Sequence, residues 1–191
     1  MRKFLAACAA AIPVLAISAL TAAAQTPPAA APMPPPPAPP PCTENCMAKE
    51  ALGNYTRVKA NILKSADKMP ADAFTYKPEP DIRTFARVLN HVTEAQDRVC
   101  AAVNSGKPNE VPPETADKAT IVAALKASFD ECDKAYAALT DANSPEMLQT
   151  FMGKRSRIGL LWGNASHDNE QYATLALYLR LKGITPPSSE K

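Results

Sequence analysis

The side chains of this chain best suited to metal or acid–base chemistry are its two histidines, His91 and His167. A neutral imidazole binds divalent transition metals, and it titrates near physiological pH. Gln171 follows His167 by four residues, and this spacing places both side chains on one face of a helix. Polar side chains that point into a core need partners. These residues therefore indicate an internal polar or metal site.

A long helix is expected to carry His167. From Arg157 onward, apolar and polar side chains recur at steps of three and four residues, which is the spacing of one inward helix face. Gly183 and the following Pro186 are typical of a helix end, which we place near Lys182. The residues on the inward face are Leu160, Leu161, Asn164, His167, Gln171, Leu175, Tyr178 and Leu179.

Three further amphipathic helices are expected before this one. Asp81 and Asp117 are candidate N-caps for the second and third helices. Ser144-Pro145 predicts the start of a short helical segment that contains Met147, Leu148 and Phe151. Strand-like alternation is missing, so we predict an all-α four-helix bundle, a fold that often builds metal or ligand sites between facing helices. The three helices span residues 46–68, 82–104 and 121–139.

Residues 1–24 have the features of a signal peptide. Arg2 and Lys3 give a charged start, an apolar run follows, and small residues precede Gln25 at the expected cleavage site. The apolar run is too short for a stable transmembrane span, which needs about 20 apolar residues. We therefore expect an exported protein located in the periplasm.

The remainder of the chain divides into a linker and a folded domain. Residues 25–41 are almost wholly Pro, Ala and Thr, a composition that favours extended polyproline II conformations. Residues 42–191 are long enough for one domain with one core. Two of the 21 basic side chains lie in the signal peptide, which leaves 19 against 19 acidic ones. Because nucleic-acid binding needs a clustered positive surface, we expect no nucleic-acid partner.

The four cysteines outside the signal peptide predict disulfides, since their number is even and the expected compartment is oxidising. We predict a bond between Cys100 and Cys132, because both lie on inward stretches of consecutive helices that we expect to run antiparallel. Two buried thiols are the alternative. Cys42 and Cys46 lack the further ligands of a zinc knuckle, so a disulfide or two free thiols are expected there.

The arrangement of the histidines resembles the DinB-like superfamily. His91 stands in the second helix, and the last helix carries the run from His167 to Tyr172, His-Asp-Asn-Glu-Gln-Tyr. The resemblance covers most of residues 47–188. It implies a four-helix bundle of the up-down-down-up type, and it implies a divalent metal that is often held by three histidines.

The resemblance also implies a ligand set. One ligand comes from the second helix, which matches His91, and two come from a His-x-x-x-His motif that here reads His167-x-x-x-Gln171. A carboxamide binds Zn or Ni more weakly than an imidazole. Glu94 and Glu170 each lie three residues after a histidine and are therefore auxiliary ligand candidates. We expect His91, His167 and Gln171 to hold a divalent metal, Zn or Ni, weakly or substoichiometrically.

Two functions are compatible with these residues. The first is an exported metal-dependent transferase or hydrolase that acts on a small-molecule or thiol substrate, with the metal activating a thiol or water. The second is a non-catalytic helical bundle whose histidines are structural or bind a small ligand. A homodimer is compatible with either function. The metal content of the purified protein is the measurement that best separates them.

Overall fold

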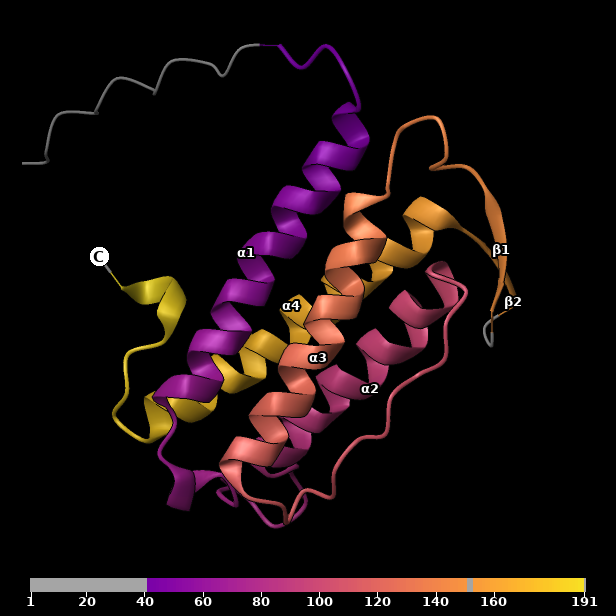
Figure 1. The fold of residues 1–191 in the computed structure, drawn as a ribbon. Coiled ribbons are helices and arrows are strands. Elements are labelled where there is room, and N and C mark those ends of the chain that lie inside the picture. The colour runs from indigo at the N-terminus through magenta and orange to yellow at the C-terminus, as the bar shows by residue number, and fades with distance from the viewer. Residues whose placement is uncertain (1–40, 151–152, 191) are drawn as a thin grey trace, which may run out of the picture. The chain divides into compact units, whose positions relative to one another are not determined.

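The computed structural model describes residues 41–150 and 153–190, and four long helices dominate them (Figure 1). This confirms the predicted four-helix bundle. The predicted signal peptide, and the predicted linker except Pro41, lie outside the described residues. No helix within the described ranges is both long and apolar enough to cross a membrane. The elements are α1 (Cys46–Lys68), η1 (Ala71–Ala73), α2 (Phe85–Val103), α3 (Lys118–Ala137), β1 (Met147–Thr150), β2 (Gly153–Ser156), α4 (Arg157–Leu181) and η2 (Pro187–Ser189).

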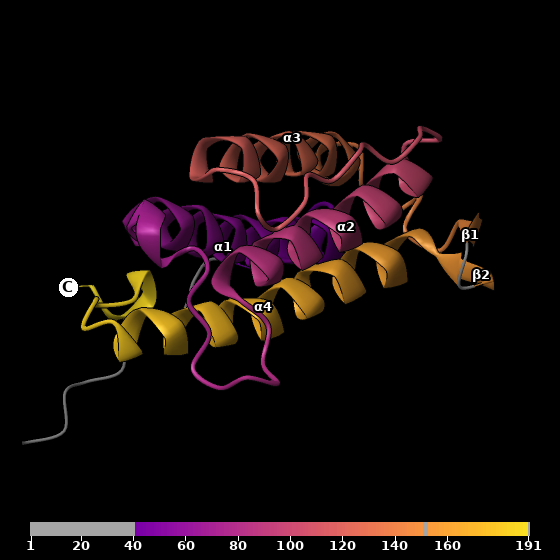
Figure 2. The ribbon, with the colours of Figure 1, turned by 90° about the horizontal axis from the view of Figure 1, so that it is seen from below.

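The helices follow the up-down-down-up order, and α1 and α2 lie between α3 and α4 (Figure 2). Helices α2 and α3 run parallel, because Gln96 contacts Ser128 and Cys100, four residues later, meets Cys132, also four residues later. Segment 104–117 connects α2 to α3 and runs back along the length of the bundle (Figure 1). The expected antiparallel direction of these two helices is therefore wrong.

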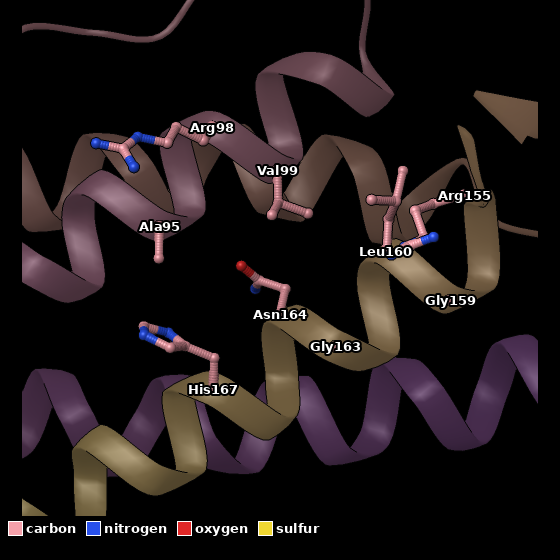
Figure 3. A pocket seen from close by; sticks show the side chains of 9 residues that line it. All are labelled: Ala95, Arg98, Val99, Arg155, Gly159, Leu160, Gly163, Asn164 and His167. Carbon is pink, nitrogen blue, oxygen red and sulfur yellow. The ribbon is translucent and has the colours of Figure 1, made fainter. Parts of the chain in front are cut away.

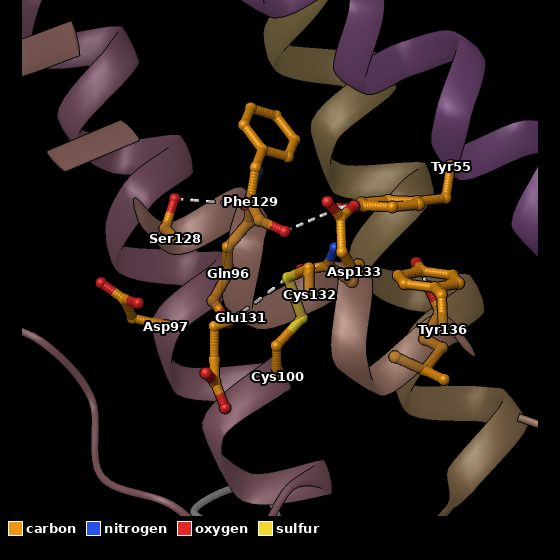
Figure 4. The surroundings of a disulfide bond; sticks show 12 residues. Tyr55, Gln96, Asp97, Cys100, Ser128, Phe129, Glu131, Cys132, Asp133 and Tyr136 are labelled. Carbon is orange, nitrogen blue, oxygen red and sulfur yellow. Dashed lines mark hydrogen bonds between the residues drawn. A yellow bond between two sulfur atoms is a disulfide. The ribbon is translucent and has the colours of Figure 1, made fainter. Parts of the chain in front are cut away.

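The predicted disulfide is nevertheless present. Cys100 and Cys132 are bonded, with their Cα atoms 5.0 Å apart, and both residues are fully buried between α2 and α3 (Figure 4). Parallel helices bring them together because each cysteine lies about four turns from the start of its own helix. A second disulfide joins Cys42 to Cys46 at the start of α1.

Aromatic side chains fill the core between α1 and α3. Tyr55 stacks on Tyr136 with ring centroids 4.0 Å apart, and its hydroxyl donates to Asp133 Oδ1 at 2.8 Å (Figure 4). Such pairs bury large apolar areas while the hydroxyl keeps a partner. In the loop before α2, Phe74 is buried against Phe85, so burial of an aromatic ring holds this proline-containing loop to the bundle.

The helix ends have caps, although one differs from the prediction. The Asp117 side chain accepts from the Thr120 N–H and caps α3, as expected. Helix α2 begins at Phe85, where the Thr84 hydroxyl accepts from the Arg87 N–H, so Asp81 is not its cap. The helix starts later because the residues before Thr84 form an exposed turn, and the first buried side chain of the α2 face is Phe85.

The predicted short helix around Met147 is wrong. Residues 147–150 form strand β1, which pairs antiparallel with β2 in the register Met147 to Ser156 and Thr150 to Gly153. Met147 is 58% exposed, so its apolar spacing does not mark a buried helix face. Gly153 has a φ of +84°, a left-handed conformation that a hairpin can use and a helix cannot.

Candidate metal centre

The two histidines meet across the interface of α2 and α4. The Nε2 atoms of His91 and His167 lie 3.2 Å apart, and their rings are edge to face with centroids 4.9 Å apart. Helices α2 and α4 run antiparallel, and each places its histidine near the middle of its length. Both side chains are a little over one-quarter exposed, so solvent reaches the pair.

The other ring nitrogens face carboxylates. Nδ1 of His91 is 3.7 Å from Glu94 Oε2, and Nδ1 of His167 is 3.6 Å from Asp168 Oδ1. A carboxylate beside Nδ1 favours the tautomer with its proton on Nδ1. That tautomer leaves a lone pair on each Nε2, and the two lone pairs then point toward one another. This arrangement is stable only when a proton or a cation lies between the two nitrogens.

The surroundings of His91 disfavour its protonation. Burial lowers its pKa from the usual 6.5, and the positive charge of Arg83 and the neighbouring His167 lower it further. Glu94 acts in the opposite direction, but it is also held by Arg87, whose two terminal nitrogens each lie 3.1 Å from one of its carboxylate oxygens. A neutral imidazole is the form that binds a metal.

Asp168 is a member of the site that helical spacing left off the inward face, as a surface group or as a group behind the metal ligands, and the structure places it behind His167. Its side chain is fully buried, and its Oδ2 accepts from Gln96 Nε2 at 3.2 Å and from Asn164 Nδ2 at 3.4 Å. Burial raises the pKa of the Asp168 carboxyl above its usual value. The four-residue step from Asn164 to Asp168 was a signal in the sequence that could have placed it on the inward face.

The remaining ligand candidates occupy a neighbouring hollow. Gln171 lies one turn beyond His167 on α4 and is 7% exposed. It lines a hollow of about 330 Å³ together with Glu170 and with Val88, which lies one turn before His91 on α2. Glu94 lies on the Nδ1 side of His91, so it faces the nitrogen opposite the one that meets His167. The structure thus brings His91 and His167 together and places Gln171 one turn further along α4, at the neighbouring hollow.

The distance between the two Nε2 atoms can be compared with the distance that a bound divalent transition metal requires. Two nitrogens bound to one ion at about 2.0–2.1 Å are separated by about 3.3–3.4 Å when the angle is near tetrahedral. The observed Nε2 separation of 3.2 Å lies just below this range. In the described ranges, no three His, Cys, Asp or Glu side chains converge to hold an ion. The separation of the two imidazole nitrogens is close to that needed by such an ion, and the Gln171 carboxamide lies one turn further along α4.

A cavity adjoins the histidine pair on the side opposite Gln171. It has a volume of about 400 Å³, within the range of small-molecule sites, and lies between α2 and α4 (Figure 3). Its wall is largely apolar or glycine. The lining residues are Ala95, Arg98, Val99, Arg155, Gly159, Leu160, Gly163, Asn164 and His167.

Comparison with known proteins shows what this chain resembles in sequence and in fold. The sequence pattern of the DinB superfamily matches residues 54–175. Among solved structures, a DinB-like protein from Bacillus cereus ATCC 10987 has a similar fold, with a TM-score of 0.61 and 17% identity over 73% of this chain and 95% of that one. A conserved protein from Enterococcus faecalis has a TM-score of 0.58 and 14% identity over 70% and 95%. No curated protein matches the sequence.

Proposed function

Since the chain belongs to the DinB superfamily, we propose that it binds a divalent transition-metal ion, Zn or Ni, between the Nε2 atoms of His91 and His167. Gln171 is the third donor in this proposal. The protein then acts as a metal-dependent transferase or hydrolase on a small-molecule or thiol substrate. The observation that carries the proposal is the 3.2 Å separation of the two Nε2 atoms, with both Nδ1 atoms turned to carboxylates.

The protein's own residues have defined tasks in this proposal. The charges of Glu94 and Asp168, 3.7 and 3.6 Å from the Nδ1 atoms, favour the tautomer that directs lone pairs at the ion. The pairing of Glu94 with Arg87 keeps that carboxylate on the Nδ1 side. When bound, the metal would supply a Lewis acid that lowers the pKa of a thiol or water. A carboxamide in place of a third imidazole makes binding weak, so we expect substoichiometric metal after purification.

The test is metal content and affinity, measured without any assumption about the substrate. The purified protein is titrated with Zn²⁺ and Ni²⁺ by calorimetry, and His91→Ala is titrated beside it. Loss of this ligand should weaken binding by roughly 100-fold or more, since removal of an outer-shell partner alone costs 10- to 100-fold. Asn169→Ala on the exposed side of α4 is the control and should bind like the parent. Equal affinity of the parent and His91→Ala contradicts the proposal.

Export to the periplasm is part of the proposal, because the features of residues 1–24 are those of a signal peptide. The mature chain should begin at Gln25. N-terminal sequencing of protein expressed with its full leader measures this, and a mature chain that begins at Met1 contradicts it.

A second function has one observation in its favour. The two Nε2 atoms are within hydrogen-bond distance, so a single shared proton also satisfies them. In that case the pair is structural and the bundle is non-catalytic. The same titration separates the two functions, because a structural pair binds no metal and His91→Ala changes only the free energy of unfolding.

A further inference from the structure

We propose that the cavity between α2 and α4 binds a small carboxylic acid with an apolar body and an amide N–H, such as an N-acylated amino acid. The cavity begins at His167 and extends toward the start of α4 (Figure 3). That this ligand is the substrate rests on the proposed function, because its reacting group would then face the histidine pair. Binding of the ligand to the cavity needs no metal.

The walls of the cavity select an apolar body. Ala95 and Val99 from α2 face Leu160, Gly159 and Gly163 from α4 (Figure 3). Gly159 and Gly163 are four residues apart, so they lie on one face and leave the α4 backbone open to the cavity. At Gly163, no atom lies within 4 Å of the position that a Cβ would take. The volume of about 400 Å³ holds about a dozen water-sized groups, enough for a branched or ring-sized body.

A buried acceptor at the cavity selects a hydrogen-bond donor. The Asn164 side chain is 3% exposed, and its Oδ1 atom has no hydrogen-bond partner. The amide nitrogen of Asn164 points to Asp168 Oδ2, and this contact directs Oδ1 the other way. Figure 3 shows the oxygen turned toward α2, between Ala95 and Val99. A buried acceptor without a donor is unfavourable, so an N–H or O–H on the ligand gains affinity at this position.

The charge of the lining selects an anion. Arg98 and Arg155 are the fully charged side chains of the lining, and it contains no carboxylate. Both arginines are exposed, so they lie at the rim, whereas Val99 and Leu160 are buried inside. A rim of one sign raises the local concentration of ligands of the opposite charge. A carboxylate at the rim, an amide N–H near Asn164 and an apolar body inside together describe the ligand.

The binding test uses metal-free protein in EDTA and the probe N-acetyl-L-leucine, followed by chemical-shift changes of the backbone amides of α2 and α4. Two analogues each lack one recognised group. N-acetyl-L-leucine methyl ester lacks the charge, and 4-methylpentanoate lacks the amide. We expect the acid to bind at least about tenfold more tightly than either analogue, which corresponds to about 1.4 kcal/mol.

Two pairs of variants locate the ligand. Gly163→Leu places a side chain in the cavity and should weaken binding at least about tenfold. Gly53→Leu is its control, because Gly53 is also a helical glycine with no atom within 4 Å of its Cβ position, and it lies on α1. Leucine has a higher helix propensity than glycine, so neither change should prevent folding. Arg155→Gln should weaken binding severalfold, whereas Lys154→Gln, its neighbour in β2, should not.

Three results would overturn this inference: no binding of N-acetyl-L-leucine, binding of either analogue as tightly as the acid, or equal affinities of Gly163→Leu and Gly53→Leu for the acid. The metal titration of the proposed function is read separately. If the protein binds the acid but no metal, only the proposed function is contradicted. If it binds metal but not the acid, only the proposed cavity ligand is contradicted.

Discussion

Helix α2 meets its two neighbours in contrasting ways. Toward α3 it is joined by the Cys100–Cys132 disulfide, and Gln96 bonds to Ser128 in a fully buried interface (Figure 4). Toward α4 it presents His91 to His167, and the cavity opens beside the pair (Figure 3). One interface is covalent and closed, whereas the other is polar and partly open.

The difference assigns stability and function to opposite faces of one helix. A cavity and a pair of partly exposed imidazoles contribute little packing, so the α2–α4 interface alone would hold α2 loosely. The disulfide fixes α2 against α3 and so maintains its register. Asp168 links the two regions, because it lies beside His167 and also accepts from Gln96.

The largest expected effect is on the closed interface. Replacing Cys100 and Cys132 together by alanine should lower the free energy of unfolding by roughly 3–4 kcal/mol, because the bond closes a loop of about 30 residues in the unfolded chain. Chemical denaturation under non-reducing conditions measures this. The control is the double change Cys42→Ser and Cys46→Ser, whose loop spans four residues and should contribute less. At 25 °C the folded alanine variant should keep the parent's metal affinity.

The next effect is on the open interface. Gln171→His completes the set of three imidazoles and should raise the affinity for Zn or Ni by around ten- to a hundredfold. Calorimetry on the variant and the parent measures the ratio. Thr174→His, one turn further along the same hollow, is the matched control and should change affinity less. An unchanged affinity of Gln171→His would exclude position 171 as a ligand position.

A smaller effect is expected from the carboxylate behind His91. Glu94→Gln keeps the size of the side chain but removes the charge that favours a proton on Nδ1. Metal affinity should fall by about tenfold, the lower range for an outer-shell partner. The free energy of unfolding should change far less, because the pair with Arg87 is partly exposed. A loss of stability without a loss of affinity would make Glu94 a structural residue only.

The smallest expected effect is on the pH dependence of stability, through the buried Asp97 on α2. Burial is the main cause that raises the pKa of Asp97, which is 1% exposed and accepts from Asn109. A raised pKa means that stability is fully present below the unfolded-state value, near 4, and is lost as pH rises through the folded-state pKa. Asp97→Asn should therefore be more stable than the parent at neutral pH, and the advantage should vanish in acid.

Asp117 provides the comparison of opposite sign. Its hydrogen bond with the Thr120 N–H at the start of α3 lowers its pKa. Asp117→Asn should therefore lose a little stability at neutral pH, and this difference should disappear as pH falls through the folded-state pKa. Denaturation midpoints of both variants from pH 3 to pH 8 measure the two trends, and trends of the same sign would contradict the assignment.

Much of the architecture was predictable from local patterns. Spacing of apolar side chains predicted four helices, and the observed ends of α1 and α4 agree with it to within one residue. The positions of His91 and His167 on inward edges also followed from spacing. These features depend on residues within a few turns of one another, and a helix repeats every 3.6 residues regardless of what packs against it.

The tertiary structure decided the remaining features, because they depend on residues far apart in the chain. Spacing was compatible with an inward Asp168, four residues after Asn164, but only the packing of the helices decided that Asp168 is fully buried while the neighbouring His167 stays partly exposed. The parallel direction of α2 and α3 depends on the path of segment 104–117, and β1 depends on pairing with β2. The 3.2 Å contact between His91 and His167 depends on the register of α2 against α4, which interhelical packing sets.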